Sequence, residues 1–144
     1  MHHDRAHVYR AIQESTCYGL ELNLRTVRNK GFEPDRITVC GGAVSSRDWM
    51  QMHANVTGLD IVITKVQDGP TLGSAMMAAV AAGRFADLQD AADVMVHEAE
   101  VFTPDAERHE EYRFWMDQYA TLYPAMREVH RAVANHLSQR DKEK

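Results

Sequence analysis

The chain has little cysteine: only Cys17 and Cys40 occur among 144 residues. Two cysteines cannot build the set of bridges that holds small secreted domains together. They also provide too few ligands for a structural zinc site. Both lie among apolar residues, and free cysteines are commonly buried. We therefore expect two buried thiols in a reducing cytoplasm.

The chain also lacks an excess of positive charge and any long apolar run. Its net charge is −5, which argues against a nucleic-acid-binding protein, because such proteins usually show a basic patch. No segment reaches the apolar length of a membrane span, and no signal peptide is recognised. The composition, with 44% hydrophobic and 26% charged residues, is typical of a soluble globular protein. We expect one cytoplasmic domain with no membrane or nucleic-acid partner.

What the chain does contain is an alternation of helical and extended patterns. Two short apolar segments, residues 37–40 and 60–64, read as strands, and the second suits a strand covered on both faces. Helical signals mark residues 4–30, 45–58, 71–82 and 87–96, and a long tail that begins near Thr103 and Pro104. Strands that alternate with helices predict an α/β fold with parallel pairing. Two strands do not make a stable sheet, so further strands must come from elsewhere in the chain or from a partner.

Several helix details follow from single residues. Ser45 with Asp48 three positions later suggests a capping box at the start of the second helix, and Gly58 is expected to end that helix. Pro124 should kink or restart the tail. The aromatic stripe at 112–123 is expected to pack in the core rather than to stack on nucleic-acid bases, because the neighbouring charges are mainly acidic.

The turn that follows the first strand is the best candidate for chemistry. It reads Cys-Gly-Gly-Ala-Val-Ser-Ser over residues 40–46. Glycines let a ligand approach the backbone, and the next helix points its free N–H groups at the same place, which suits a phosphate. By itself such a turn is more often only a tight connection. It is neither a Walker loop nor a dinucleotide-binding motif.

A second turn of small residues strengthens this interpretation. Residues 69–75, Gly-Pro-Thr-Leu-Gly-Ser-Ala, open the third helix, although close helix–sheet packing would explain them too. Both turns follow consecutive strands, and ligands of open α/β sheets bind at the carboxyl ends of strands. Together the two turns predict a cleft wide enough for an adenine nucleotide.

The remaining polar residues offer no other centre. His3 and His7 are one helical turn apart and could share a metal, but a polar helix start is the favoured interpretation. The other histidines show no ligand spacing, and no catalytic triad can be assembled. We therefore assign no metal ligand.

The motif from Val39 to Met52, Val-Cys-Gly-Gly-Ala-Val-Ser-Ser-Arg-Asp-Trp-Met-Gln-Met, resembles the nucleotide-binding turn and helix of the FGGY family of carbohydrate kinases. Residues 53–61 and 71–83 continue the resemblance at fitting spacing. Residues 7–14 resemble the last half of a family signature, with Gln13 where an apolar residue is usual. The resemblance covers nearly the whole chain.

The resemblance implies a fold and an activity. Members have two actin-like (ribonuclease H-like) ATPase domains around a cleft, and they transfer the γ-phosphate of ATP to a sugar or polyol hydroxyl with Mg²⁺. Residues 1–144 would be the C-terminal portion of the second domain, with 104–144 as a helical tail of the same unit. The resemblance also implies the nucleotide-binding residues. Gly41, Gly42 and Ala43 would form the turn at the phosphates. Ser46 would lie near the base or ribose, and Gly73 would help to frame the adenine pocket.

The resemblance assigns no catalytic residue to this chain. The family's general base is an aspartate upstream of the helix at residues 4–30, and Asp48, Asp60 and Asp68 do not match its motif. Phosphoryl transfer depends on positioning and charge stabilisation, so we expect the isolated chain to be inactive. Residues 50–54 and 112–124 look most like ribulokinase-like members, which favours ketopentoses or pentitols ahead of xylulose or glycerol.

Three hypotheses stay open at this point. The chain is a kinase fragment, or a non-catalytic nucleotide-binding or regulatory subunit that acts with a partner chain, or a small α/β interaction domain whose glycine turns are only structural. The resemblance implies three further strands before the first helix. Without them the strand at 37–40 exposes an edge and an apolar sheet face, so we expect a homo-oligomer, most simply a two-fold dimer.

Overall fold

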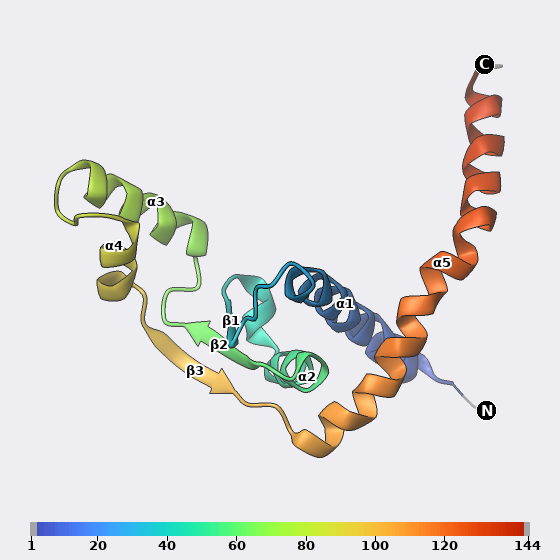
Figure 1. The fold of residues 1–144 in the computed structure, drawn as a ribbon, viewed down its shortest axis with the longest axis horizontal. Coiled ribbons are helices and arrows are strands. Elements are labelled where there is room, and N and C mark those ends of the chain that lie inside the picture. The colour runs from blue at the N-terminus through green and yellow to red at the C-terminus, as the bar shows by residue number, and fades with distance from the viewer. Residues whose placement is uncertain (1–2, 143–144) are drawn as a thin grey trace.

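The computed structural model describes residues 3–142 and shows a small mixed sheet with helices around it (Figure 1). The helices are α1 (Arg5–Arg28), the short 3₁₀ helix η1 (Gly42–Ser45), α2 (Arg47–Thr57), α3 (Gly69–Ala81), α4 (Leu88–Met95) and α5 (Ala106–Lys142). The strands are β1 (Arg36–Val39), β2 (Asp60–Thr64) and β3 (Glu98–Phe102). In this part of the chain no helix is both long and apolar enough to cross a membrane.

The sheet has the order β1-β2-β3. β1 and β2 are parallel, with Ile37 opposite Ile61, as the sequence predicts. β3 was missed by the sequence analysis: it pairs antiparallel with β2, with Phe102 opposite Ile61. The chain thus supplies its own third strand. β2 is the central strand and is buried along most of its length, which confirms the expectation for residues 60–64, while β1 lies at an edge.

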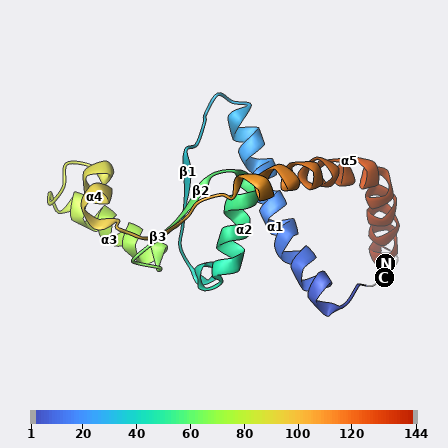
Figure 2. The ribbon, with the colours of Figure 1, turned by 90° about the horizontal axis from the view of Figure 1, so that it is seen from below.

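Two apolar clusters hold the body together, and α2 contributes to both. On the sheet side, α2 packs against side chains of η1, β2 and β3; these buried residues are Val44, Met50, Ala54, Ile61, Ile63 and Phe102. On its other side α2 packs against α1 and α5; the buried residues there are Cys17, Tyr18, Met52, Val56, Tyr112 and Met116. Figure 2 shows this arrangement, with α2 between the sheet and α1. Because the helix presents apolar residues on two sides, it connects the sheet to the helical layer.

The two cysteines differ, which corrects the expectation of two buried thiols. Cys17 is fully buried between the helices, and burial raises its pKa to about 12. Cys40 is exposed, because it follows the edge strand β1 and lies at the open end of the sheet.

Helix ends follow local signals, with two corrections. Asp4 caps α1 by accepting the backbone N–H of His7 at 3.0 Å. Gly58 ends α2 in the left-handed conformation, as predicted. The predicted capping box at Ser45 is wrong, because α2 begins at Arg47 with Ser46 as its N-cap and no side-chain capping bond. The tail helix begins at Ala106 rather than at Thr103, since the Asp105 carboxylate accepts the Arg108 N–H at 3.0 Å.

α5 is one helix that continues through Pro124. Figures 1 and 2 both show it change direction between its orange and its red part, as expected for a helix with an internal proline. Its first half packs on α1 and α2 through Tyr112 and Met116, whereas Trp115 is 51% exposed and Tyr123 is 69% exposed. The prediction that the whole aromatic stripe at 112–123 is core is therefore only half right.

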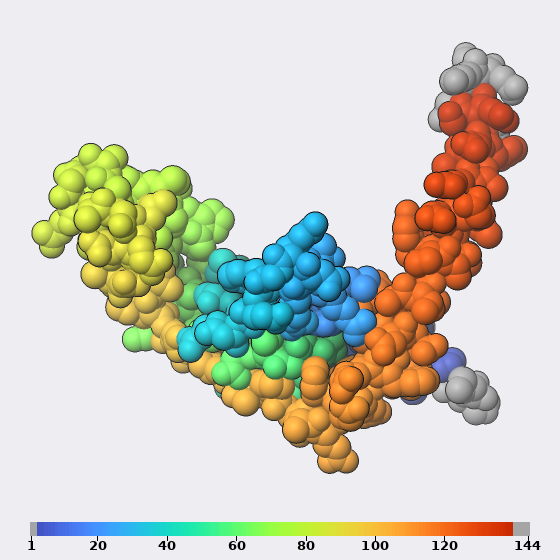
Figure 3. Space-filling model, in the orientation of Figure 1, coloured from blue at the N-terminus to red at the C-terminus, as the bar shows by residue number. Residues whose placement is uncertain are grey.

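α3 and α4 form a helical pair that lies apart from the body, and the second half of α5 lies apart on the opposite side (Figure 3). No residue of α3 is buried. Close helix–sheet packing was one explanation for the small side chains of α3. The structure does not support it, because these side chains do not pack against this sheet.

Candidate functional site

The glycine turn after β1 adopts a backbone shape that requires glycine. Gly41 has a φ of 90°, in the region that residues with a β-carbon rarely adopt. Its N–H donates to the carbonyl of Gln67 at 2.8 Å. This bond joins the turn after β1 to the loop that leads into α3.

A second contact joins the same two segments. A β-carbon at Gly69 would overlap the thiol sulfur of Cys40. Only glycine therefore allows the start of α3 to approach the end of β1 so closely. The structure thus brings together the two small-residue turns at the carboxyl ends of β1 and β2, as the strand order predicts.

Gly42 and Ala43 lie at the open face of this junction. Both residues are exposed, and a β-carbon placed on Gly42 would meet no atom within 4 Å. They begin η1, so their N–H groups have no carbonyl partner within that helix. The chain's own packing does not require glycine at position 42, whereas a ligand that contacts the backbone would.

Ser46 and Asp48 set the charge at the start of α2. The Ser46 side chain makes no capping bond, so it does not satisfy the first N–H groups of the helix. Asp48 lies in the first turn, where a carboxylate favours the helix but opposes a bound anion. Arg47 forms an ion pair with Glu100 on β3. A phosphate at this place would thus depend on backbone N–H groups rather than on an arginine.

Gly73 lies one helical turn beyond the junction, in α3. A β-carbon there would meet no atom within 4 Å. The start of α3 is held by Asp68, whose carboxylate accepts the N–H of Thr71 at 3.1 Å and its hydroxyl at 2.8 Å. The backbone and side-chain hydrogen bonds from Thr71 lower the pKa of Asp68. The sequence analysis did not single out this capping carboxylate, although its spacing of three residues before Thr71 signals it.

The two histidines near the start of the chain are neighbours, as their spacing predicts. The rings of His3 and His7 lie 5.6 Å apart, and His7 Nδ1 lies 2.7 Å from an Asp4 carboxylate oxygen. Within the described part of the chain, no three side chains of histidine, cysteine, aspartate or glutamate come close enough to hold a metal ion.

Comparisons with known proteins identify the family. Residues 1–82 match the C-terminal domain of the FGGY family of carbohydrate kinases. The xylulose kinase of Bacillus subtilis is 28% identical over 131 residues, which are 91% of this chain and 26% of that protein. The L-xylulose/3-keto-L-gulonate kinase of Escherichia coli is 29% identical over 134 residues, 93% of this chain and 27% of that protein. A ligand-bound xylulose kinase from Lactobacillus acidophilus superposes with a TM-score of 0.78 at 23% identity, over 86% of this chain and 25% of that one.

The fold is therefore α/β, part of an actin-like ATPase domain as found in sugar kinases. The match over more than half of its length shows that the chain belongs to the FGGY family of carbohydrate kinases, in the C-terminal domain. It spans about a quarter of the length of the relatives it matches.

Proposed function

We propose that this chain is the nucleotide-binding, C-terminal portion of an ATP-dependent carbohydrate kinase, and that residues 104–144 are a helical tail of the same unit. The two terminal residues of that range lie outside the described residues. The observation that carries the proposal is the junction of the two turns, where the Gly41 N–H is held by Gln67 and the backbone at Gly42 is open. Family membership supports the same assignment.

The roles of the individual residues follow from this junction. The positive φ of Gly41 turns the chain so that η1 starts beside the loop that leads into α3. The N–H groups of Gly42 and Ala43 would then donate to phosphate oxygens. Ser46 would offer its hydroxyl near the base or ribose, and Gly73 would leave room beside the adenine. ATP or ADP with Mg²⁺ is the proposed ligand of the complete enzyme. The carboxylates of Asp48 and Asp68 would repel the phosphates, and the bound metal would balance part of the phosphate charge.

We further propose that the chain does not transfer phosphate on its own. No aspartate of this chain matches the position of the family's general base. The relatives are about four times as long as the part that this chain matches. An assay with ATP, Mg²⁺ and pentuloses should therefore give no turnover with this chain alone, and measurable turnover would overturn this part of the proposal.

The proposed substrate class of the complete enzyme is a pentulose or pentitol. All three of the similar proteins described above carry xylulose in their names. The likeness of residues 50–54 and 112–124 to ribulokinase-like members stays a prediction. The choice between these subgroups can be tested by fusing the chain to the first three quarters of a relative and comparing xylulose with ribulose as acceptors.

The first experiment is a calorimetric titration of the chain with ATP and with ADP, in the presence of Mg²⁺. Gly42→Val is the test variant and Gly19→Val, in the middle of α1, is the matched control, because a β-carbon at either glycine meets no atom within 4 Å. We expect the parent and Gly19→Val to bind and Gly42→Val to lose binding. Equal binding by Gly42→Val would contradict the assignment of the phosphates to this turn.

Two proposals concern partners. A non-catalytic subunit would bind nucleotide in the same way but would gain kinase activity only when mixed with a chain that carries the missing parts, which a mixing assay detects.

Separately, β1 has no strand on its outer side among the described residues, and this supports the predicted homo-oligomer through the sheet edge. Thr38→Pro would remove an edge N–H and should weaken such pairing. A cytoplasmic location stays a prediction.

A further inference from the structure

The second half of α5 presents an apolar stripe that no other part of the chain covers among the described residues. Every described residue from Thr121 to Gln139 is exposed. Leu122, Met126, Val129 and Val133 are each 44–56% exposed and follow one another at steps of four, three and four residues. These steps place them on one side of the helix. Figure 3 shows this half of α5 projecting away from the body.

A helix in this state lacks its usual source of stability. Most helical stability in proteins comes from packing of an apolar face. Pro124 has no backbone N–H, so one helical hydrogen bond is missing where the second half of α5 begins. A surface that covers the stripe would stabilise this half of α5.

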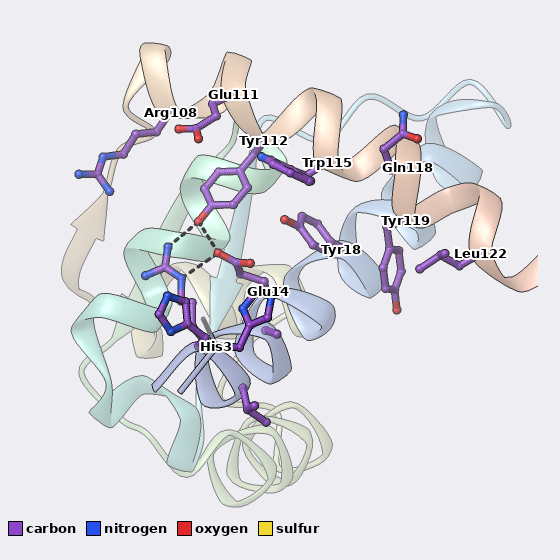
Figure 4. A pocket seen from close by; sticks show the side chains of 14 residues that line it. His3, Glu14, Tyr18, Arg108, Glu111, Tyr112, Trp115, Gln118, Tyr119 and Leu122 are labelled. Atoms are coloured by element: carbon purple, nitrogen blue, oxygen red, sulfur yellow. Dashed lines mark hydrogen bonds and ion pairs between the residues drawn. The ribbon is translucent and has the colours of Figure 1, made fainter. Parts of the chain in front are cut away.

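The chain itself offers a matching surface. An open groove of about 870 Å³ lies between α1 and the first half of α5 (Figure 4). Its apolar lining includes Val8, Tyr18, Trp115, Tyr119 and Leu122. One wall is fixed by a hydrogen-bonded set, in which Arg10 donates to the Tyr112 hydroxyl at 2.5 Å and that hydroxyl donates to Glu14 at 3.1 Å. The groove is therefore a preformed surface on which a helix could pack.

The groove and the stripe belong to one repeating pattern. Tyr112, Trp115, Tyr119, Leu122, Met126, Val129 and Val133 follow alternating steps of three and four residues, which is the spacing of a helix that packs against another helix. The pattern is symmetric about Pro124. An antiparallel partner helix would place Leu122 opposite Met126, Tyr119 opposite Val129, and Trp115 opposite Val133.

Charge favours the antiparallel direction. Between residues 106 and 117, four carboxylates oppose two arginines, for a net charge of −2. Between residues 124 and 139, two arginines oppose one glutamate, for a net charge of +1. An antiparallel pair sets each acidic half beside a basic half, whereas a parallel pair would set like charges together.

We propose that two copies of this chain associate through α5, each placing residues 126–137 in the α1–α5 groove of the other. The contact is two-fold and the same surface serves both copies. Pro124 lies at the symmetry axis, and the change of direction there carries the second half of the helix away from its own groove. This interface does not involve the Gly41–Ala43 turn, so it stands or falls independently of nucleotide binding.

Cysteine cross-linking tests the direction of the pairing. In a Cys40→Ser background, Trp115→Cys with Val133→Cys should form a covalent dimer on mild oxidation. An internal bridge is excluded, because 18 residues of helix span about 27 Å, far beyond the roughly 7 Å reach of a disulfide. Arg113→Cys with Asn135→Cys, on other sides of the helix, is the matched control and should stay monomeric. Trp115→Cys alone should not cross-link, since only a parallel pair would bring those two sites together.

Sedimentation velocity tests the stripe itself. We expect the parent chain to sediment at twice the mass of one copy, and Val133→Asp to weaken association about tenfold or more. Asn135→Asp, which adds the same charge off the stripe, should weaken association much less than Val133→Asp. A monomeric parent, or a dimer unaffected by Val133→Asp, would overturn the proposal. If only Thr38→Pro dissociates the dimer, the copies pair through β1 and this interface is wrong.

Discussion

At the scale of single residues, the end of α2 is under both a conformational and a steric constraint. Gly58 has a φ of 70°, and a β-carbon there would lie 2.7 Å from the ring of His109. The ring is itself held by a hydrogen bond of 2.9 Å between its Nδ1 and the carbonyl of Asn55. The glycine therefore serves both the helix end and the packing of α5 on α2.

We expect Gly58→Ala to lower the free energy of unfolding by about 2–4 kcal/mol, from backbone strain and from the clash with His109. Gly83→Ala is the matched control, because Gly83 has a φ of 71° but no neighbour within 4 Å of its β-carbon position. It should cost only about 1–2 kcal/mol. Urea unfolding measures both, and equal losses would show that His109 moves aside freely.

His53 makes stability depend on pH. Burial lowers its pKa from 6.5, and its Nδ1 is buried without a hydrogen-bond partner among the described residues. The unfolded chain thus binds a proton more readily than the folded one. The stability that neutral His53 allows is present above the unfolded pKa of about 6.5 and is lost as the pH falls towards the lower folded pKa.

We therefore expect His53→Gln to flatten the decrease in unfolding free energy between neutral and mildly acidic pH, measured by urea unfolding at several pH values. His136→Gln, an exposed site on α5, should keep the slope of the parent. An unchanged slope in the His53 variant would assign the acid sensitivity to other groups.

At the scale of elements, α3 should be the least protected helix of the chain. None of its residues is buried, whereas six of the eleven residues of α2 are. Local opening exposes little new apolar surface where little is buried, so its free energy is low. Amide hydrogen exchange should give α3 protection at least about tenfold below that of α2. Equal protection would show that α3 is covered in solution, by a partner or a second copy.

The elements also show how far a sequence can be interpreted. Periodic apolar residues and strong end signals predicted α1, α2, β2 and α4 within a few residues of their bounds. β3 escaped because Glu100 lies two residues before the buried Phe102, on the same face, so no apolar face can be recognised in the sequence. Its strand form depends on pairing with β2 and on ion pairs with Arg36 and Arg47. Local patterns cannot report such tertiary support.

The candidate site was predictable to a similar degree. The order of strands and glycine turns placed the two turns together, and the bond between Gly41 and Gln67 confirms that they meet. The position of Gly73 relative to the turn depends on how α3 leaves the sheet, which no local pattern determines. The α1–α5 groove was missed because its residues lie about 100 positions apart in the chain.

At the scale of the whole molecule, the chain combines a packed body with two projecting parts, the α3–α4 pair and the second half of α5 (Figure 3). Both projecting parts carry exposed apolar residues, among them Met77 at 57% and Val133 at 54%. The chain spans about a quarter of the length of its relatives. Projecting surfaces of this kind are expected to contact other parts of an assembly.

Removal of residues 124–144 separates the stability of the body from that of the assembly. No described side chain between residues 124 and 139 is buried, so at low concentration the shortened chain should melt within about 2 °C of the parent. The parent should melt higher as its concentration rises, by roughly 2–4 °C for each tenfold increase, because only folded copies associate. The shortened chain should lose this dependence. A shortened chain that melts much lower at every concentration would show that the second half of α5 packs on its own body, and that a second copy is not its partner.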